Sequence, residues 1–131
     1  MRQLLLLLAA LLVACQVGTK PSTFPPAVTP NGVAATIRTV GNAKVAGELL
    51  AVEESALLVW RAGTAMARVP LDAIEQARFD KLRVTISRGY TLSKGDREQL
   101  RLTSRFPHGI RDDTMARLLE ASGAQSVEEI R

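Results

Sequence analysis

Short runs of apolar and β-branched residues, separated by turns at intervals of about eight to twelve residues, constrain the fold of this chain more than any other feature. Most of these runs alternate apolar and polar side chains, which is typical of strands with one buried face. Gly47 lies inside the second run, where a glycine often marks a bend or a bulge. Five short strands at this spacing predict a small antiparallel barrel or sandwich. The predicted strands cover residues 36–40, 44–53, 56–60, 66–69 and 82–87.

The order of three stretches in this region is informative about the fold. The stretch 45–54 (VAGELLAVEE) carries the internal glycine and ends in an acidic turn, and it is followed by the aliphatic run 57–59 and the mixed stretch 69–74 (VPLDAI). This order resembles the Sm-like and related SH3-like small barrels, and the resemblance implies a barrel over residues 35–88. It implies no RNA-binding residues, because Glu53-Glu54-Ser55 stands where the RNA-binding members have an acidic–asparagine pair.

The C-terminal third of the chain changes to helical periodicity. A first helix is predicted after Ser93 or Asp96, either of which can cap it. A second helix is predicted over 112–123, with two aspartates at its start and a glycine at its end. The capping-box pattern at 126–129 predicts a final helical turn. The predicted fold is therefore mainly β with a C-terminal α segment: a small five-stranded antiparallel SH3-like or Sm-like barrel followed by two or three short helices.

The N-terminus has the parts of a secretory leader. Arg2 precedes an apolar stretch at 4–14, which is shorter than the roughly 20 residues of a bilayer-spanning helix. Leu12-Val13-Ala14-Cys15 resembles the lipobox of bacterial lipoproteins. The resemblance implies cleavage between Ala14 and Cys15 and a diacylglyceryl group on the Cys15 sulfur, with fatty acyl chains such as palmitate. An ordinary signal peptide without lipid and a buried N-terminal helix are the alternatives.

Two features around Cys15 indicate the cellular location of the protein. Cys15 is the only cysteine, so it cannot form an intramolecular disulfide, and lipidation would remove its free thiol. Gln16 follows it where many inner-membrane lipoproteins have aspartate, so the resemblance implies an outer-membrane lipoprotein that faces the periplasm. The prolines that follow favour extended chain. The predicted organisation is a signal peptide at 1–14, a lipidated cysteine and tether at 15–34, the barrel at 35–88 and a helical segment at 89–131.

Positive charge is concentrated in residues 78–105, which carry eight basic and three acidic side chains, a net charge of +5. Such a stretch can contact an acidic partner, or it can be an ordinary solvated surface. The second interpretation is favoured because acidic residues interrupt the stretch. The candidate contacts to an anionic partner are Arg83, Arg88, Lys94, Arg97, Arg101 and Arg105.

No residue pattern predicts catalysis. His108 is the only histidine, and neither a second histidine nor a further cysteine is present to complete a typical zinc site. We therefore expect no catalytic residue, no metal and no cofactor, and a role as a membrane-anchored, non-catalytic interaction module of the cell envelope. The expected partners are membrane lipid through Cys15 and another envelope protein or the cell wall.

A surface-tethered nucleic-acid binder is the alternative function. The segments 106–110, 115–123 and 126–130 are together similar to half of a helix-hairpin-helix element, which binds DNA phosphates through a glycine loop. In that loop His108 intervenes in the family pattern and Arg111 replaces the second glycine. Nucleic acid is therefore not the partner that we expect first.

Overall fold

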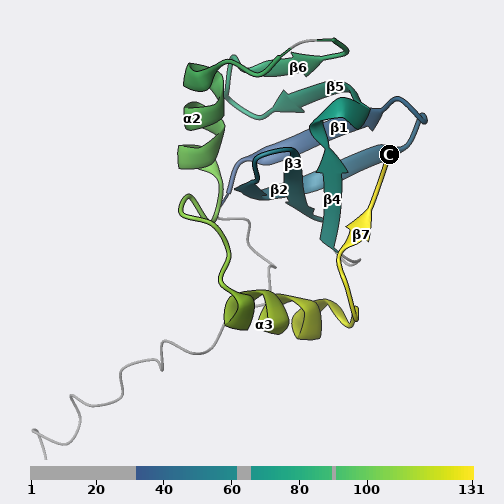
Figure 1. The fold of residues 1–131 in the computed structure, drawn as a ribbon, viewed down its shortest axis with the longest axis vertical. Coiled ribbons are helices and arrows are strands. Elements are labelled where there is room, and N and C mark those ends of the chain that lie inside the picture. Colours follow the sequence, from purple (N-terminus) through teal and green to yellow (C-terminus); the bar gives the residue numbers. More distant parts are fainter. Residues whose placement is uncertain (1–31, 62–65, 90) are drawn as a thin grey trace, which may run out of the picture.

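In the part of the chain that the structure describes, a seven-stranded mixed sheet carries two α-helices (Figure 1). The structure is a computed structural model, and it describes residues 32–61, 66–89 and 91–131. The strands are β1 (Ala34–Thr39), β2 (Lys44–Val52), β3 (Ala56–Trp60), β4 (Met66–Pro70), β5 (Ile74–Phe79), β6 (Thr85–Ser87) and β7 (Glu128–Glu129). The helices are α2 (Lys94–Thr103) and α3 (Asp112–Ser122), and a 3-10 turn, η2 (Leu71–Ala73), links β4 to β5.

The prediction of a five-stranded antiparallel SH3-like or Sm-like barrel is wrong. The strand order is β6-β5-β1-β2-β3-β4-β7, so the sheet of the described residues has seven strands, and its outermost strands, β6 and β7, do not pair with each other. Neighbouring strands are antiparallel except for the parallel pair β4–β7. The sheet stays open because β6 pairs with the outer edge of β5 and β7 pairs with the outer edge of β4. Those are the edges that would have to meet in a closed five-stranded barrel.

Strand β2 joins the two halves of the sheet. Its first residues, up to Glu48, pair with β1, and the residues from Glu48 onward pair with β3. The register with β3 shifts between Leu49 and Ala51, which marks an irregularity of the β-bulge type. Gly47 lies next to Glu48, where the two pairings meet, and the backbone of β3 comes very close to it. The irregularity itself lies two to four residues further along the strand than the glycine at which the sequence predicts a bend or bulge.

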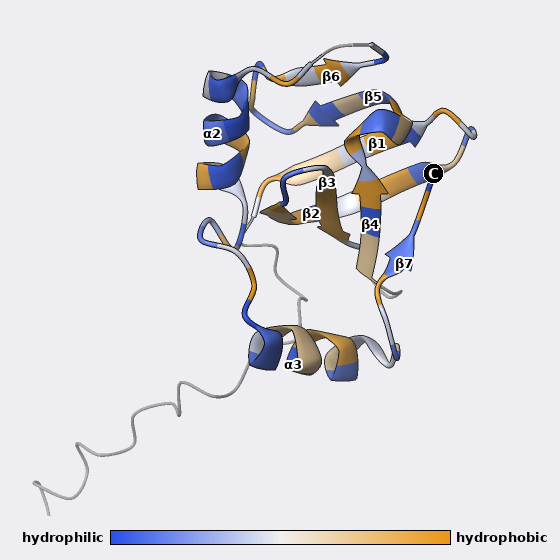
Figure 2. Ribbon diagram, in the orientation of Figure 1, coloured by the Kyte–Doolittle hydropathy of each residue, from blue (hydrophilic) through white to orange (hydrophobic). Residues whose placement is uncertain are grey.

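Two apolar clusters lie on opposite faces of the sheet. In β3 the odd-numbered residues Leu57 and Val59 belong to the first cluster, which Leu100 of α2 joins. Leu58 and Trp60 belong to the second cluster, which contains Leu118 of α3. Because both of its faces are covered, β3 is buried and apolar along its whole length, whereas β7 is hydrophilic (Figure 2). A strand buried on both faces is expected to lack the usual alternation.

The two helices begin and end largely as their sequences predict. Ser93 is the N-cap of α2, and its hydroxyl accepts a hydrogen bond from the backbone N–H of Asp96 at 3.1 Å. Gly123 ends α3 in the left-handed conformation, with φ of 71°. The predicted final helical turn is wrong, because Glu128 and Glu129 form β7 beside β4.

A cationic open face as the candidate functional site

Arg105, one of the six predicted contacts to an anionic partner, lies inside the protein. Its guanidinium faces the carboxylate of Glu48 at 3.6 Å, and the two side chains are only 7% and 2% exposed. The other oxygen of this carboxylate accepts a hydrogen bond of 2.7 Å from the backbone N–H of Gly32. Arg105 also lies 5.7 Å from the ring centroid of Phe106. This arginine therefore holds the fold together and presents no charge to a partner.

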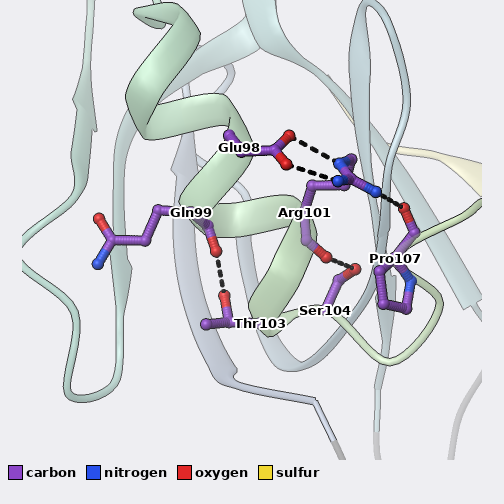
Figure 3. A network of polar contacts seen from close by, with 6 residues as sticks. All are labelled: Glu98, Gln99, Arg101, Thr103, Ser104 and Pro107. Carbon is purple, nitrogen blue, oxygen red and sulfur yellow. Dashed lines mark hydrogen bonds and ion pairs between the residues drawn. The ribbon is translucent and has the colours of Figure 1, made fainter.

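Arg101 is held by a neighbour on the same helix and by the following loop (Figure 3). Its guanidinium donates two hydrogen bonds to the carboxylate of Glu98, at 2.8 and 2.6 Å, and a third to the carbonyl of Pro107 at 2.7 Å. The hydrogen bond from Arg101 lowers the pKa of Glu98, and the same bond raises the pKa of Arg101. The carboxylate thus stays ionised to lower pH than usual, and the charge of Arg101 is balanced there.

Hydroxyl groups complete this C-terminal end of α2. Ser104 donates a hydrogen bond of 2.6 Å to the carbonyl of Arg101, and Thr103 donates one of 2.9 Å to the carbonyl of Gln99 (Figure 3). These bonds engage carbonyls of the last turn. The polar network at residues 98–107 is therefore a helix end fixed to its loop.

The other four basic side chains predicted to contact an anionic partner differ in their interactions within the protein. Arg97 donates hydrogen bonds to the carbonyls of Glu53 and Glu54, at 2.9 and 3.0 Å, and so ties α2 to the β2–β3 turn. Arg88 lies 3.8 Å from the carboxylate of Glu75. Arg83 and Lys94 are exposed, and neither makes an ion pair with another described residue.

A second group of cations gathers on the sheet itself. Arg38 of β1, Lys44 of β2 and Arg78 of β5 are all exposed. Together with Thr36 and Gln76 they line a shallow depression of about 340 Å³. We call the surface formed by these five residues the open face. Neither helix contributes a residue to the lining of this depression.

The strand register explains why these cations meet. Arg38 is directly opposite Lys44, Gln76 is opposite Arg38, and Arg78 is opposite Thr36. Side chains directly opposite one another on one face of an antiparallel pair have Cβ atoms about 4.5–5.5 Å apart. None of the three cations makes an ion pair with another described residue. The open face therefore concentrates positive charge that no described carboxylate pairs with.

Part of this surface could have been found from the sequence. The alternation in 36–40 and the turn at Gly41-Asn42-Ala43 place Arg38 and Lys44 on one face of a hairpin. Arg78 could not be added, because the strand that carries it was not predicted. The concentration of charge along the sequence pointed instead to α2, where the arginines are held by internal partners.

We expect the substitution Lys44→Gln to stabilise the protein slightly. Like charges directly opposite one another in a sheet are destabilising, and cross-strand pairs contribute roughly 0.2–1 kcal/mol. Removing the charge opposite Arg38 should raise the free energy of unfolding by an amount within that range. Urea denaturation in low salt measures the change, and the gain should shrink in 1 M salt, where screening acts within about 3 Å. Lys44→Arg, which keeps the charge, is the control; a loss of stability in Lys44→Gln at low salt would contradict the repulsion.

Comparison with known proteins gives no relative for this chain: no family model, curated protein or solved structure matches it. Within residues 32–61, 66–89 and 91–131, no group of three or more histidine, cysteine, aspartate or glutamate side chains could hold a metal ion. None of the helices in these ranges is both long and apolar enough to cross a bilayer. The lipobox and Cys15 lie outside the described residues.

Proposed function

We propose that this chain is a lipid-anchored, non-catalytic interaction module of the bacterial cell envelope. The observation that carries the interaction role is the open face, where Arg38, Lys44 and Arg78 are exposed without a balancing carboxylate among the described residues. These side chains project from paired strands, which hold their relative positions better than loops would. A partner with negative charge would complete the electrostatics of this surface.

The anchor is the second part of the proposal and rests on the sequence Leu12-Val13-Ala14-Cys15. A lipoprotein of this kind would carry two or three acyl chains on Cys15, and two lipid signals are what stable membrane attachment takes. Gln16 supports a location at the outer membrane, on the side of the periplasm. The partners within reach are the membrane surface, another envelope protein and the cell wall.

A surface-tethered nucleic-acid binder is the second candidate, because an exposed cluster of cations attracts the phosphates of any polyanion. The predicted helix-hairpin-helix likeness lends it little support. Glu128 and Glu129, which belong to the last segment of that likeness and were expected in a helical turn, form strand β7 instead. Phosphate contacts would make the affinity for DNA fall steeply as salt is added, and a salt titration with duplex DNA tests this candidate.

The anchor is tested by the substitution Cys15→Ala in cells that process lipoproteins. We expect the variant to accumulate as an uncut precursor, or as a product cut elsewhere without acyl chains, because the lipid acceptor is missing. The intact mass of the wild-type protein from the membrane fraction should correspond to a chain that begins at Cys15 and carries added acyl groups. A wild-type mass that begins at another residue and lacks lipid would refute the anchor.

A further inference from the structure

We propose that the open face binds the anionic headgroups of the bilayer to which the protein is anchored, so that the domain lies with this face against the membrane. The inference rests on the proposed lipid anchor and assigns the interaction surface its partner. The ligand chemistry is a layer of phosphodiester groups, as in phosphatidylglycerol.

The arrangement of donors on the open face fits phosphate oxygens. Arg38 and Lys44 are opposite each other, so one phosphate between them would contact two cations and relieve their mutual repulsion. Thr36 and Gln76 occupy the neighbouring positions opposite Arg78 and Arg38, where their hydroxyl and amide groups can donate to further oxygens. The face therefore offers charged and neutral donors side by side.

The point where the tether joins the domain lies on the same side of the sheet as this face. The backbone N–H of Gly32 donates to Glu48, which lies on β2 four residues after Lys44 and, by strand alternation, on the same side of the sheet. The chain thus reaches the sheet on the side that carries the open face. The 16 residues between Cys15 and Gly32 would span at most about 50 Å as extended polyproline-like chain. The domain is consequently held within reach of the headgroups.

A lipid surface fits the open face better than single-stranded nucleic acid does. Proteins that bind single strands stack successive bases on exposed aromatic side chains. None of the residues that line the depression is aromatic, and Phe79, which follows Arg78 in β5, is buried in the first apolar cluster. Each cation near an anionic leaflet contributes only about fivefold in binding, which would be weak in solution. Anchoring to the same bilayer makes such a weak contact effective, because it raises the local concentration.

The test uses the complete mature chain from residue 15 with Cys15→Ser, so that no acyl chain contributes to binding. Its partition onto vesicles of phosphatidylglycerol and phosphatidylethanolamine is compared with that onto phosphatidylcholine alone. We expect binding to the anionic vesicles only, and a loss of roughly 100-fold in the triple variant Arg38→Gln, Lys44→Gln, Arg78→Gln. The matched control is Lys81→Gln, Arg83→Gln, Lys94→Gln, which removes the same charge from exposed positions outside the open face and should stay within about fivefold of the parent.

Three results would overturn the inference. The first is equal loss of vesicle binding in the two triple variants, and the second is no binding of the parent chain to the anionic vesicles. The third is retention of a duplex DNA by the open face under conditions in which the vesicles are not bound, which would assign the face to nucleic acid. A mass spectrum that shows a lipidated Cys15 would leave the anchor standing in either case, so the failure of this inference is distinguishable from the failure of the proposed function.

Discussion

The substitution Gly47→Val is expected to lower the free energy of unfolding by about 3 kcal/mol or more, at or beyond the upper end of the usual range for overpacking. A Cβ atom at this position would lie 1.9 Å from the carbonyl oxygen of Trp60 and 2.8 Å from its carbonyl carbon. Both atoms belong to the backbone of β3, so no side-chain rotation can relieve the collision. Strands β2 and β3 would have to separate where β2 passes from one partner strand to the other.

Trp60 makes this prediction convenient to measure, because it is the only tryptophan and lies at the collision. Urea denaturation followed by its fluorescence reports the midpoint of unfolding directly. The matched control is Ala46→Val, which puts the same β-branched side chain on the neighbouring, exposed position of β2. That variant should stay within about 0.5 kcal/mol of the parent. Equal midpoints for the two valine variants would show that the close approach at Gly47 does not constrain the sheet.

The sequence predicted the elements whose local pattern is strong. The bounds of β3 agree with its continuous apolar run, and Ser93 and Gly123 mark a start and an end of helices as predicted. Strand β5 was missed because the alternation fails at its start. Thr39 pairs with Ile74 and Arg38 pairs with Gln76, so the intervening Glu75 is an extra residue in a bulge.

Strand β7 was missed for a different reason. Its residues carry a local capping-box pattern, whereas their pairing with Ala67 and Arg68 of β4 is a long-range interaction that no local pattern encodes. An ion pair between Arg61 and Glu128 and a hydrogen bond of 2.9 Å from the N–H of Ile130 to the carbonyl of Arg68 fix this segment beside β4. These tertiary contacts therefore override the local helical preference of residues 126–129. Because β7 then occupies the outer edge of β4, that edge is not available to close a barrel.

The cationic site could be predicted only in part, because its residues also depend on long-range contacts. A count of charges along the sequence treats Arg97, Arg101 and Arg105 as equally available, because it contains no information about their partners. The structure engages Arg97 with carbonyl groups 43 and 44 residues away in sequence and Arg105 with Glu48. Arg38, Lys44 and Arg78, which make no ion pair with another described residue, come from three different strands. Their proximity follows from strand register, which the sequence alone did not give for β5.

Removing the arginine of the buried pair is the second change with a large expected effect. In Arg105→Met the carboxylate of Glu48 would stay buried without the guanidinium that now faces it at 3.6 Å. Breaking a buried pair by removing one partner costs about 3–5 kcal/mol, mainly because an uncompensated charge remains inside. We expect a loss in this range in urea denaturation.

The double variant Glu48→Gln, Arg105→Met separates this explanation from a simple loss of packing. It removes the buried charge but keeps an amide oxygen as acceptor for the N–H of Gly32. We therefore expect the double variant to be more stable than Arg105→Met alone, since replacing a buried pair by neutral groups is often tolerated. Losses that simply add would show that the two side chains act independently. This pair lies where Gly32, β2 and the end of α2 meet. The backbone N–H groups of residues 33 and 105 donate to the carbonyls of Thr103 and Leu49, and their amide exchange should become faster in Arg105→Met as stability is lost.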